Sequence, residues 1–137
     1  MRTEAAISRP GATAPVVESV DLEPPRAGEV LIQITASGIC HTDLGVHAGR
    51  GPGTPLPAVL GHEGAGVILE TGPGVTHLQV GDHVVLSGSS CGVCPSCLRN
   101  FPSYCREAMP RNFGGQRMDG SSAISQNGTR LGGHFFG

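Results

Sequence analysis

The chain has 137 residues, which favours a single domain. Nine basic and 11 acidic residues give a net charge of −2, so the balance favours neither nucleic acid nor an anionic membrane as a partner. Charged residues make up only 15%, which argues against a charge-driven disordered chain. With 22 glycines, 11 prolines and no tryptophan, the composition favours a turn-rich, mainly β domain with a thin aliphatic core.

The first expected elements are two strands and a short helical segment. Residues 14–22 are β-branched and contain a proline, which predicts an edge strand. Residues 29–36 (EVLIQITA) alternate in polarity, as a half-buried strand does. A Ser-Gly turn then leads into a short helical segment at residues 40–43. The aliphatic face of the second strand consists of Val30, Ile32 and Ile34.

The rest of the chain is expected to contain more strands, joined by loops. Residues 49–57 hold several glycines and prolines and predict a loop, whereas the apolar runs at 59–69 and 80–86 predict strands. Residues 87–120 show little periodicity but contain four cysteines. Residues 131–137 (LGGHFFG) are apolar and strand-like.

Targeting signals and cysteine content indicate the compartment. No stretch approaches the roughly 18 apolar residues of a membrane span, and the start of the chain lacks the hydrophobic run of a secretory signal. Five cysteines in such a chain predict thiolates in a reducing, cytoplasmic compartment rather than disulfides.

Four of the cysteines form one motif, C-x2-C-x2-C-x7-C, made of Cys91, Cys94, Cys97 and Cys105. Four closely spaced thiolates suit a closed tetrahedral structural zinc site. The surrounding lobe, about residues 87–120, has almost no hydrophobic core, so a bound metal would fold it. An iron–sulfur cluster also takes four cysteines, but the seven-residue gap does not match the bacterial ferredoxin run.

The fifth cysteine, Cys40, follows a strand and a turn, and His62 comes 22 residues later, beside Glu63. A cysteine and a histidine are suitable ligands for a catalytic zinc, which takes three protein ligands and keeps an open position. A lone cysteine is also common as a small buried hydrophobe, and a histidine beside a glutamate often forms a surface ion pair. The residue types alone leave both interpretations open.

Three motifs resemble those of the zinc-dependent medium-chain alcohol dehydrogenases. The stretch Gly61-His62-Glu63-x2-Gly66-x5-Gly72-x2-Val75 resembles the signature of that family. Residues 38–43 (GICHTD) resemble the segment with its first catalytic zinc ligand, and the four-cysteine spacing is similar to that of its structural zinc lobe. Together these motifs cover residues 29–105, and residues 112–137 resemble the aryl-alcohol (benzyl alcohol) dehydrogenase branch.

The resemblance implies a fold and a reaction. Residues 1–137 would form a GroES-like, partly open β-barrel with short helices and a zinc-stapled loop lobe. They would be the N-terminal part of an enzyme, truncated before its Rossmann domain. The whole enzyme would oxidise a primary, aromatic or allylic alcohol reversibly to its aldehyde with NAD(P). It would be a homo-oligomer whose partner is a small alcohol or aldehyde.

The resemblance also implies the residues of the catalytic zinc site. Cys40 and His62 would be zinc ligands, and Asp43 would accept a hydrogen bond from the His62 imidazole and fix its tautomer. Glu63 would lie just behind the metal, able to approach it during ligand exchange.

Two neighbours would serve the substrate and the cofactor. Thr42 would hold the alcohol hydroxyl and pass on its proton, and His41 would face the pyrophosphate of the cofactor. Zinc would lower the pKa of the alcohol, which then gives a hydride to the nicotinamide.

The sequence departs from the family in three ways. No G-x-G-x-x-G follows a strand, and no cysteine is left over for the third catalytic ligand. Gly45 stands where some members have a relay histidine, with His47 two residues away. These departures predict that the chain is inactive by itself. Two alternatives are a zinc-binding or chaperonin-like module without catalysis and an iron–sulfur electron carrier.

Overall fold

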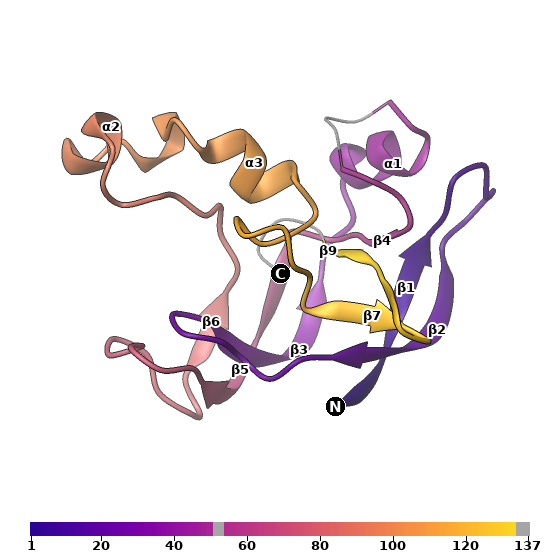
Figure 1. Ribbon diagram of the computed structural model, residues 1–137, viewed down its shortest axis with the longest axis horizontal. Helices are drawn as coiled ribbons and strands as arrows, with labels where there is room; N and C mark the ends of the chain where they lie inside the picture. Colours follow the sequence, from indigo (N-terminus) through magenta and orange to yellow (C-terminus); the bar gives the residue numbers. More distant parts are fainter. Residues whose placement is uncertain (51–53, 134–137) are drawn as a thin grey trace.

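The computed structural model describes residues 1–50 and 54–133, and these form a partly open β-barrel (Figure 1). One sheet has six strands in the order β8-β7-β2-β1-β4-β9, and the other has three in the order β3-β5-β6. All neighbouring strands pair antiparallel except β4 and β9. The strands are β1 (Arg2–Ser8), β2 (Val16–Leu22), β3 (Val30–Ser37), β4 (Ala58–Val59), β5 (Gly64–Thr71), β6 (His83–Val85), β7 (Ile124–Gln126), β8 (Thr129–Arg130) and β9 (Gly132–Gly133). The predicted mainly β barrel is confirmed.

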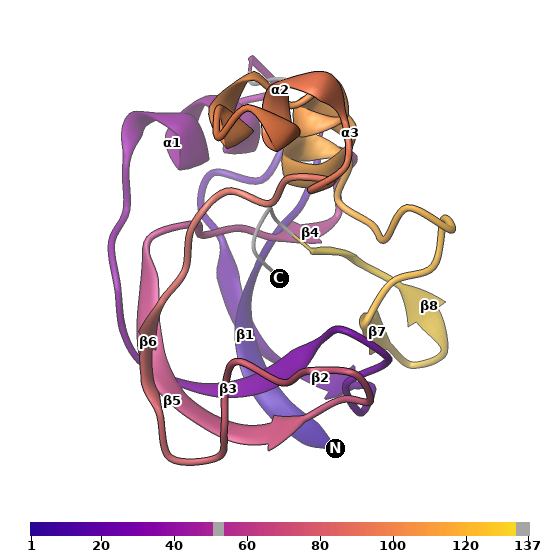
Figure 2. The same ribbon diagram turned by 90° about the vertical axis from the view of Figure 1, so that its left-hand side faces the viewer.

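The helices are short and gather at one end of the barrel, as Figures 1 and 2 both show. They are α1 (His41–His47), α2 (Pro95–Leu98), the 3-10 turn η1 (Pro102–Tyr104) and α3 (Ala108–Phe113). In the described part of the chain, no helix has the length and apolar character needed to cross a membrane. The short helix expected at residues 40–43 is confirmed as the start of α1.

At the start of the chain, one strand was missed and the predicted edge position of another is wrong. Strand β1 was not expected, because most of its side chains are exposed and only Ile7 and Ser8 are buried, so the sequence carries little alternation. Strand β2 is not an edge strand, since it lies between β1 and β7. Pro15 precedes β2 and therefore removes no hydrogen bond from the sheet.

The later predictions hold in outline. Strand β3 lies where expected, but Ile34, predicted on its buried face, is 50% exposed. The run 80–86 forms only the three-residue strand β6. The predicted loop 49–57 includes residues 51–53, and the strand-like end 131–137 includes 134–137, all of which lie outside the described residues.

The core is thin and aliphatic, as the composition predicts. Its central cluster consists of Ile7, Val20 and Leu131, which join β1, β2 and the segment before β9. Burial of each such side chain stabilises the fold by about 1.5–3 kcal/mol. Ile68 on β5 is also fully buried.

Two glycines of the family signature are required by close backbone contacts. A Cβ at Gly66 would overlap the carbonyl oxygen of Gln33 on β3, and a Cβ at Gly72 would overlap the carbonyl oxygen of Arg26. Both positions therefore exclude any other side chain without a backbone shift. The missing side chains allow Gly66 on β5 to lie close to β3, and Gly72 to lie close to the turn at Arg26.

An ion-pair network joins the end of the cysteine lobe to the barrel. The Arg117 guanidinium donates to both carboxylate oxygens of Glu29, at 2.5 and 2.9 Å, and to Glu23 at 2.9 Å. The hydrogen bonds from Arg117 hold the pKa of Glu29 below its usual range. Arg26 adds a more exposed contact to Asp119 at 3.2 Å.

Candidate metal centres

Cys40 lies where β3 ends and helix α1 begins, and it is the N-cap of that helix. The Thr42 amide donates to Cys40 Sγ at 3.2 Å, and the Cys40 amide donates to Asp43 Oδ2 at 2.9 Å. These reciprocal bonds satisfy two backbone donors that the helix leaves free. They also fix the sulfur at the end of the helix.

His62 reaches the same point from the segment between β4 and β5. Its Nε2 lies 3.2 Å from Cys40 Sγ, within the separation of about 4 Å expected for two ligands of one zinc ion. On the other side of the ring, Nδ1 lies 3.2 Å from Asp43 Oδ1. An Nδ1–H donating to Asp43 leaves the Nε2 lone pair directed toward Cys40, which is the tautomer that a metal requires.

The Asp43 carboxylate is buried and ionised. Burial by itself raises the pKa of Asp43, but the Cys40 amide and the His62 imidazole outweigh that effect and hold it below its usual range. A permanent negative charge is thus placed behind the imidazole, where it increases the basicity of a ligand.

Glu63 completes the group. One carboxylate oxygen of Glu63, Cys40 Sγ and a ring nitrogen of His62 all lie within 4.8 Å of one another. Sulfur, imidazole nitrogen and carboxylate oxygen are all zinc ligands, so this set fits the metal. Thr42 is half-buried beside the group, and His41 is exposed at the first residue of α1.

The four lobe cysteines form a second, separate group. Their sulfur atoms all lie within 4.8 Å of one another, with Cys94 and Cys97 at 3.5 Å and Cys91 and Cys97 at 3.9 Å. A tetrahedral site with Zn–S bonds near 2.3 Å places its sulfurs about 3.8 Å apart. All five cysteines of the chain are free. The lobe therefore fits a structural zinc ion.

Backbone amides favour thiolates in this lobe. The amides of Arg106 and Cys97 donate to Cys94 and lower its thiol pKa to about 6. Burial and the neighbouring Cys94 raise the pKa of Cys97 to about 11. Four adjacent sulfurs cannot all ionise without a cation, so this pattern fits a divalent metal at their centre.

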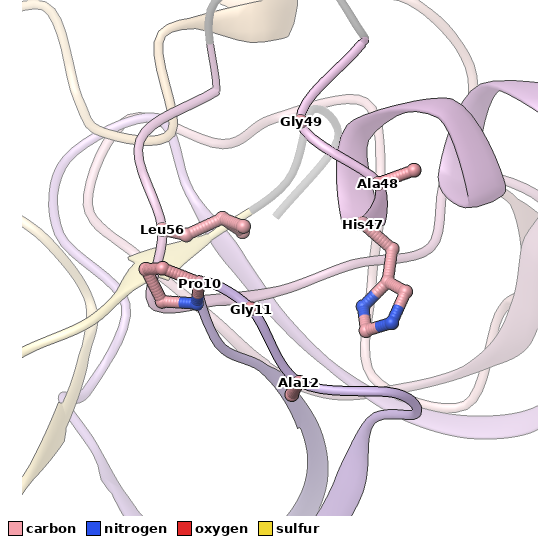
Figure 3. A pocket seen from close by; sticks show the side chains of 7 residues that line it. All are labelled: Pro10, Gly11, Ala12, His47, Ala48, Gly49 and Leu56. Carbon is pink, nitrogen blue, oxygen red and sulfur yellow. The ribbon is translucent and has the colours of Figure 1, made fainter.

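His47 is not part of either group. It lies at the far end of α1, about 9 Å along the helix from His41, and its Nδ1 contacts Ser8 Oγ on β1 at 2.5 Å. The ring lines a cavity of about 380 Å³ together with Leu56 and the turn at Pro10–Ala12 (Figure 3). The Ser8 contact was not predicted, because two isolated polar residues 39 positions apart carry no sequence signal.

A β-barrel with a Cys–His–Glu group at one helix end and a four-cysteine lobe has the residues of a metal-binding domain. A family model for the alcohol dehydrogenase GroES-like domain matches residues 26–130, and the chain belongs to this family. The fold is therefore the expected GroES-like one.

Comparisons with individual proteins lead to the same family. The chain is 44% identical to the class-3 alcohol dehydrogenase of Cereibacter sphaeroides over 91% of its own length and 34% of that protein. It is 44% identical to the geraniol dehydrogenase of Castellaniella defragrans, over 98% of its own length and 36% of that protein. The crystal structure of benzyl alcohol dehydrogenase from Acinetobacter calcoaceticus matches with a TM-score of 0.91 at 43% identity, covering 99% of this chain and 36% of that one. The chain thus spans about a third of the length of these relatives.

Proposed function

We propose that this domain supplies the catalytic metal site of a zinc-dependent, NAD(P)-linked alcohol dehydrogenase. The observation that carries the proposal is the 3.2 Å approach of Cys40 Sγ to His62 Nε2, with the Asp43 carboxylate on the opposite side of the ring. A buried carboxylate that fixes the tautomer of a histidine facing a cysteine is an arrangement suited to holding zinc. Cys40 and His62 are the proposed ligands.

When bound, zinc would act as a Lewis acid that lowers the pKa of an alcohol oxygen. Residues of this chain surround the proposed position of the metal and the alcohol. The Thr42 amide donates to the Cys40 sulfur, and the half-buried Thr42 hydroxyl would hold the alcohol hydroxyl, accept its proton at Oγ1 and pass its own hydroxyl proton on toward solvent. Glu63 provides a carboxylate able to approach the metal when the ligands exchange.

The cofactor would be bound largely by residues outside this chain. His41, exposed at the start of α1, is the proposed contact with the cofactor pyrophosphate. The 137 residues contain no G-x-G-x-x-G motif for a dinucleotide. Positioning the nicotinamide against the alcohol carbon is worth about 7–11 kcal/mol of the barrier, so we expect no hydride transfer by this chain alone.

A primary aromatic or allylic alcohol is the proposed substrate class. The names of two relatives, benzyl alcohol dehydrogenase and geraniol dehydrogenase, support it. In the lobe, Cys91, Cys94, Cys97 and Cys105 are the proposed ligands of a structural zinc. The five free cysteines support a reducing, cytoplasmic location.

Metal content tests the proposal most directly. Purified chain with zinc in the lobe should bind one further Co²⁺ and develop thiolate-to-cobalt absorption, and the Cys40→Ser variant should not. A wild-type chain that binds no second metal would overturn the catalytic site and favour a zinc-binding module without catalysis. With benzyl alcohol and NAD, the chain alone should produce no reduced cofactor. Turnover above that of the Cys40→Ser control would contradict this expectation.

A further inference from the structure

Gly38, between the end of β3 and Cys40, lies against the Glu63 side chain. A Cβ built at Gly38 would overlap Glu63 Oε2 and lie 3.0 Å from Glu63 Cβ and 3.1 Å from Glu63 Cδ. The Glu63 side chain therefore occupies the space that any other residue at position 38 would fill.

The backbone holds the two residues in this arrangement. The Gly38 amide donates to the Glu63 carbonyl oxygen at 3.0 Å, next to the last β3–β5 pair, Ser37 with Gly64. The contact is thus fixed by the sheet, and only the Glu63 side chain is free to move away. That side chain ends at the carboxylate that lies within 4.8 Å of Cys40 Sγ and His62.

The backbone at Gly38 is not in the left-handed conformation that favours glycine. Its φ lies outside the range between +20° and +160°, so an alanine is compatible with the backbone conformation at this position. The reason for glycine is therefore steric. An added methyl group would conflict chiefly with the carboxylate oxygen at the end of the flexible, exposed Glu63 side chain.

We infer that Gly38 is a positioning residue for the metal site. Because Gly38 has no side chain, the Glu63 side chain can occupy that space and bring its carboxylate close to Cys40 and His62. The inference rests on the proposed metal site and adds a steric requirement to it. It assigns Glu63 a place beside the metal that depends on a residue 25 positions earlier in the chain.

Co²⁺ titration of the chain with zinc in the lobe tests the inference. The Gly38→Ala variant should bind cobalt at the Cys40 site about tenfold more weakly than wild type, or worse, as expected when a supporting group at a metal site is displaced. Thiolate-to-cobalt absorption should remain, because Cys40 and His62 are untouched. Glu63→Ala should lower the affinity similarly, and Gly38→Ala should have no further effect in the Glu63→Ala background.

Gly64→Ala is the matched control. It adds the same methyl group one residue after Glu63, where the conflict is with the flexible end of Leu86 at 2.7 Å. This variant should keep the wild-type cobalt affinity whatever stability it loses.

The outcomes separate the inference from the proposed function. Equal cobalt affinity for wild type and Gly38→Ala would overturn the role of Gly38 while leaving the metal site intact. An additive loss in the double variant would also overturn it, because Gly38 would then act independently of Glu63. A wild-type chain that binds no second cobalt would overturn both. If Gly38→Ala fails to fold, folding is tested in the double variant Gly38→Ala/Glu63→Ala. A double variant that also fails to fold would show that a clash with the Glu63 carboxylate is not the cause, and would overturn the inference.

Discussion

The four-cysteine lobe and the Cys40–His62 site hold their sulfur atoms in different ways. In the lobe, the cysteines are surrounded by exposed side chains, including Leu98 at 71% and Tyr104 at 76%, and of the four only Cys105 is buried. At the other site, Cys40 caps a helix at the end of a paired strand, and the buried Asp43 bonds to both Cys40 and His62. We therefore expect the lobe to depend on a bound metal for its structure, whereas hydrogen bonds among barrel residues hold the side chains of the second site.

Removing a ligand from the lobe should have the largest effect. Cys97 lies within 4 Å of both Cys91 and Cys94, so Cys97→Ser should abolish tight zinc binding there. A structural zinc contributes on the order of 10 kcal/mol, and the described lobe has no comparable hydrophobic core. We expect the loss of one zinc per chain and rapid proteolysis between residues 87 and 113.

Ser103→Ala is the control for that experiment, since Ser103 is an exposed lobe residue outside the cysteine cluster. It should keep its zinc and its resistance to protease. A Cys97→Ser lobe as resistant as this control would show that the segment folds without metal.

The same chemical change at Cys40 should leave the fold intact. Serine is a favoured N-cap, so Cys40→Ser keeps the bond to the Thr42 amide while removing the thiolate. We expect the free energy of unfolding to change by no more than about 0.5 kcal/mol, and cobalt binding at this site to disappear. Urea unfolding and cobalt absorption measure the two effects. Unfolding of this variant would contradict the contrast between the two sites.

Asp43→Asn should have an intermediate effect. It removes the charge behind His62, and loss of such a group weakens metal binding about 10–100-fold. The fold should also change its response to acid. Because the pKa of Asp43 is below its usual range, its contribution to stability is present at neutral pH and is lost as the pH falls through the folded-state value.

The stability of wild type and Asp43→Asn should therefore converge in acid and differ most at neutral pH. Urea midpoints measured across the acid range, with metal removed from the Cys40 site, check this. A constant difference at every pH would show that the Asp43 charge contributes nothing.

Sequence patterns predicted which cysteine and histidine side chains lie close together better than they predicted the strands. The proximity of Cys40 and His62 was expected only from the resemblance to the family motifs, and that of the four lobe cysteines from their spacing. Strand β1 was missed because five of its seven residues escape burial and so show no hydrophobic period.

Two features had no local signal in the sequence. The Ser8–His47 contact and the close approach of Gly38 to Glu63 join residues that are distant along the chain. The first depends on how β1 packs against α1, and the second on how the end of β3 lies beside the segment before β5. Composition and periodicity describe single elements, so they carry no information about which elements contact one another.

The smallest expected effect on metal binding concerns the contact between lobe and barrel. The Arg117 side chain is only 15% exposed and forms a two-bond contact with Glu29, whereas Arg26 is 45% exposed and meets Asp119, which is 62% exposed. Exposed ion pairs contribute little, whereas hydrogen bonds to charged groups contribute more when solvent is partly excluded. Arg117→Met should therefore lower the free energy of unfolding by about 1–2 kcal/mol, and Arg26→Met should change it by much less.

The pH dependence tests the cause. Arg117 lowers the pKa of Glu29, so the stabilisation by this pair is complete above the usual carboxyl pKa and disappears as the pH falls through the lower, folded-state value. Wild type and Arg117→Met should thus differ at pH 7 and converge in acid, as measured by urea unfolding at constant salt. Both should retain the same zinc content, because Arg117 contacts no cysteine sulfur among the described hydrogen bonds. A loss of lobe zinc in Arg117→Met would show that the joint with the barrel, and not the metal alone, holds the lobe together.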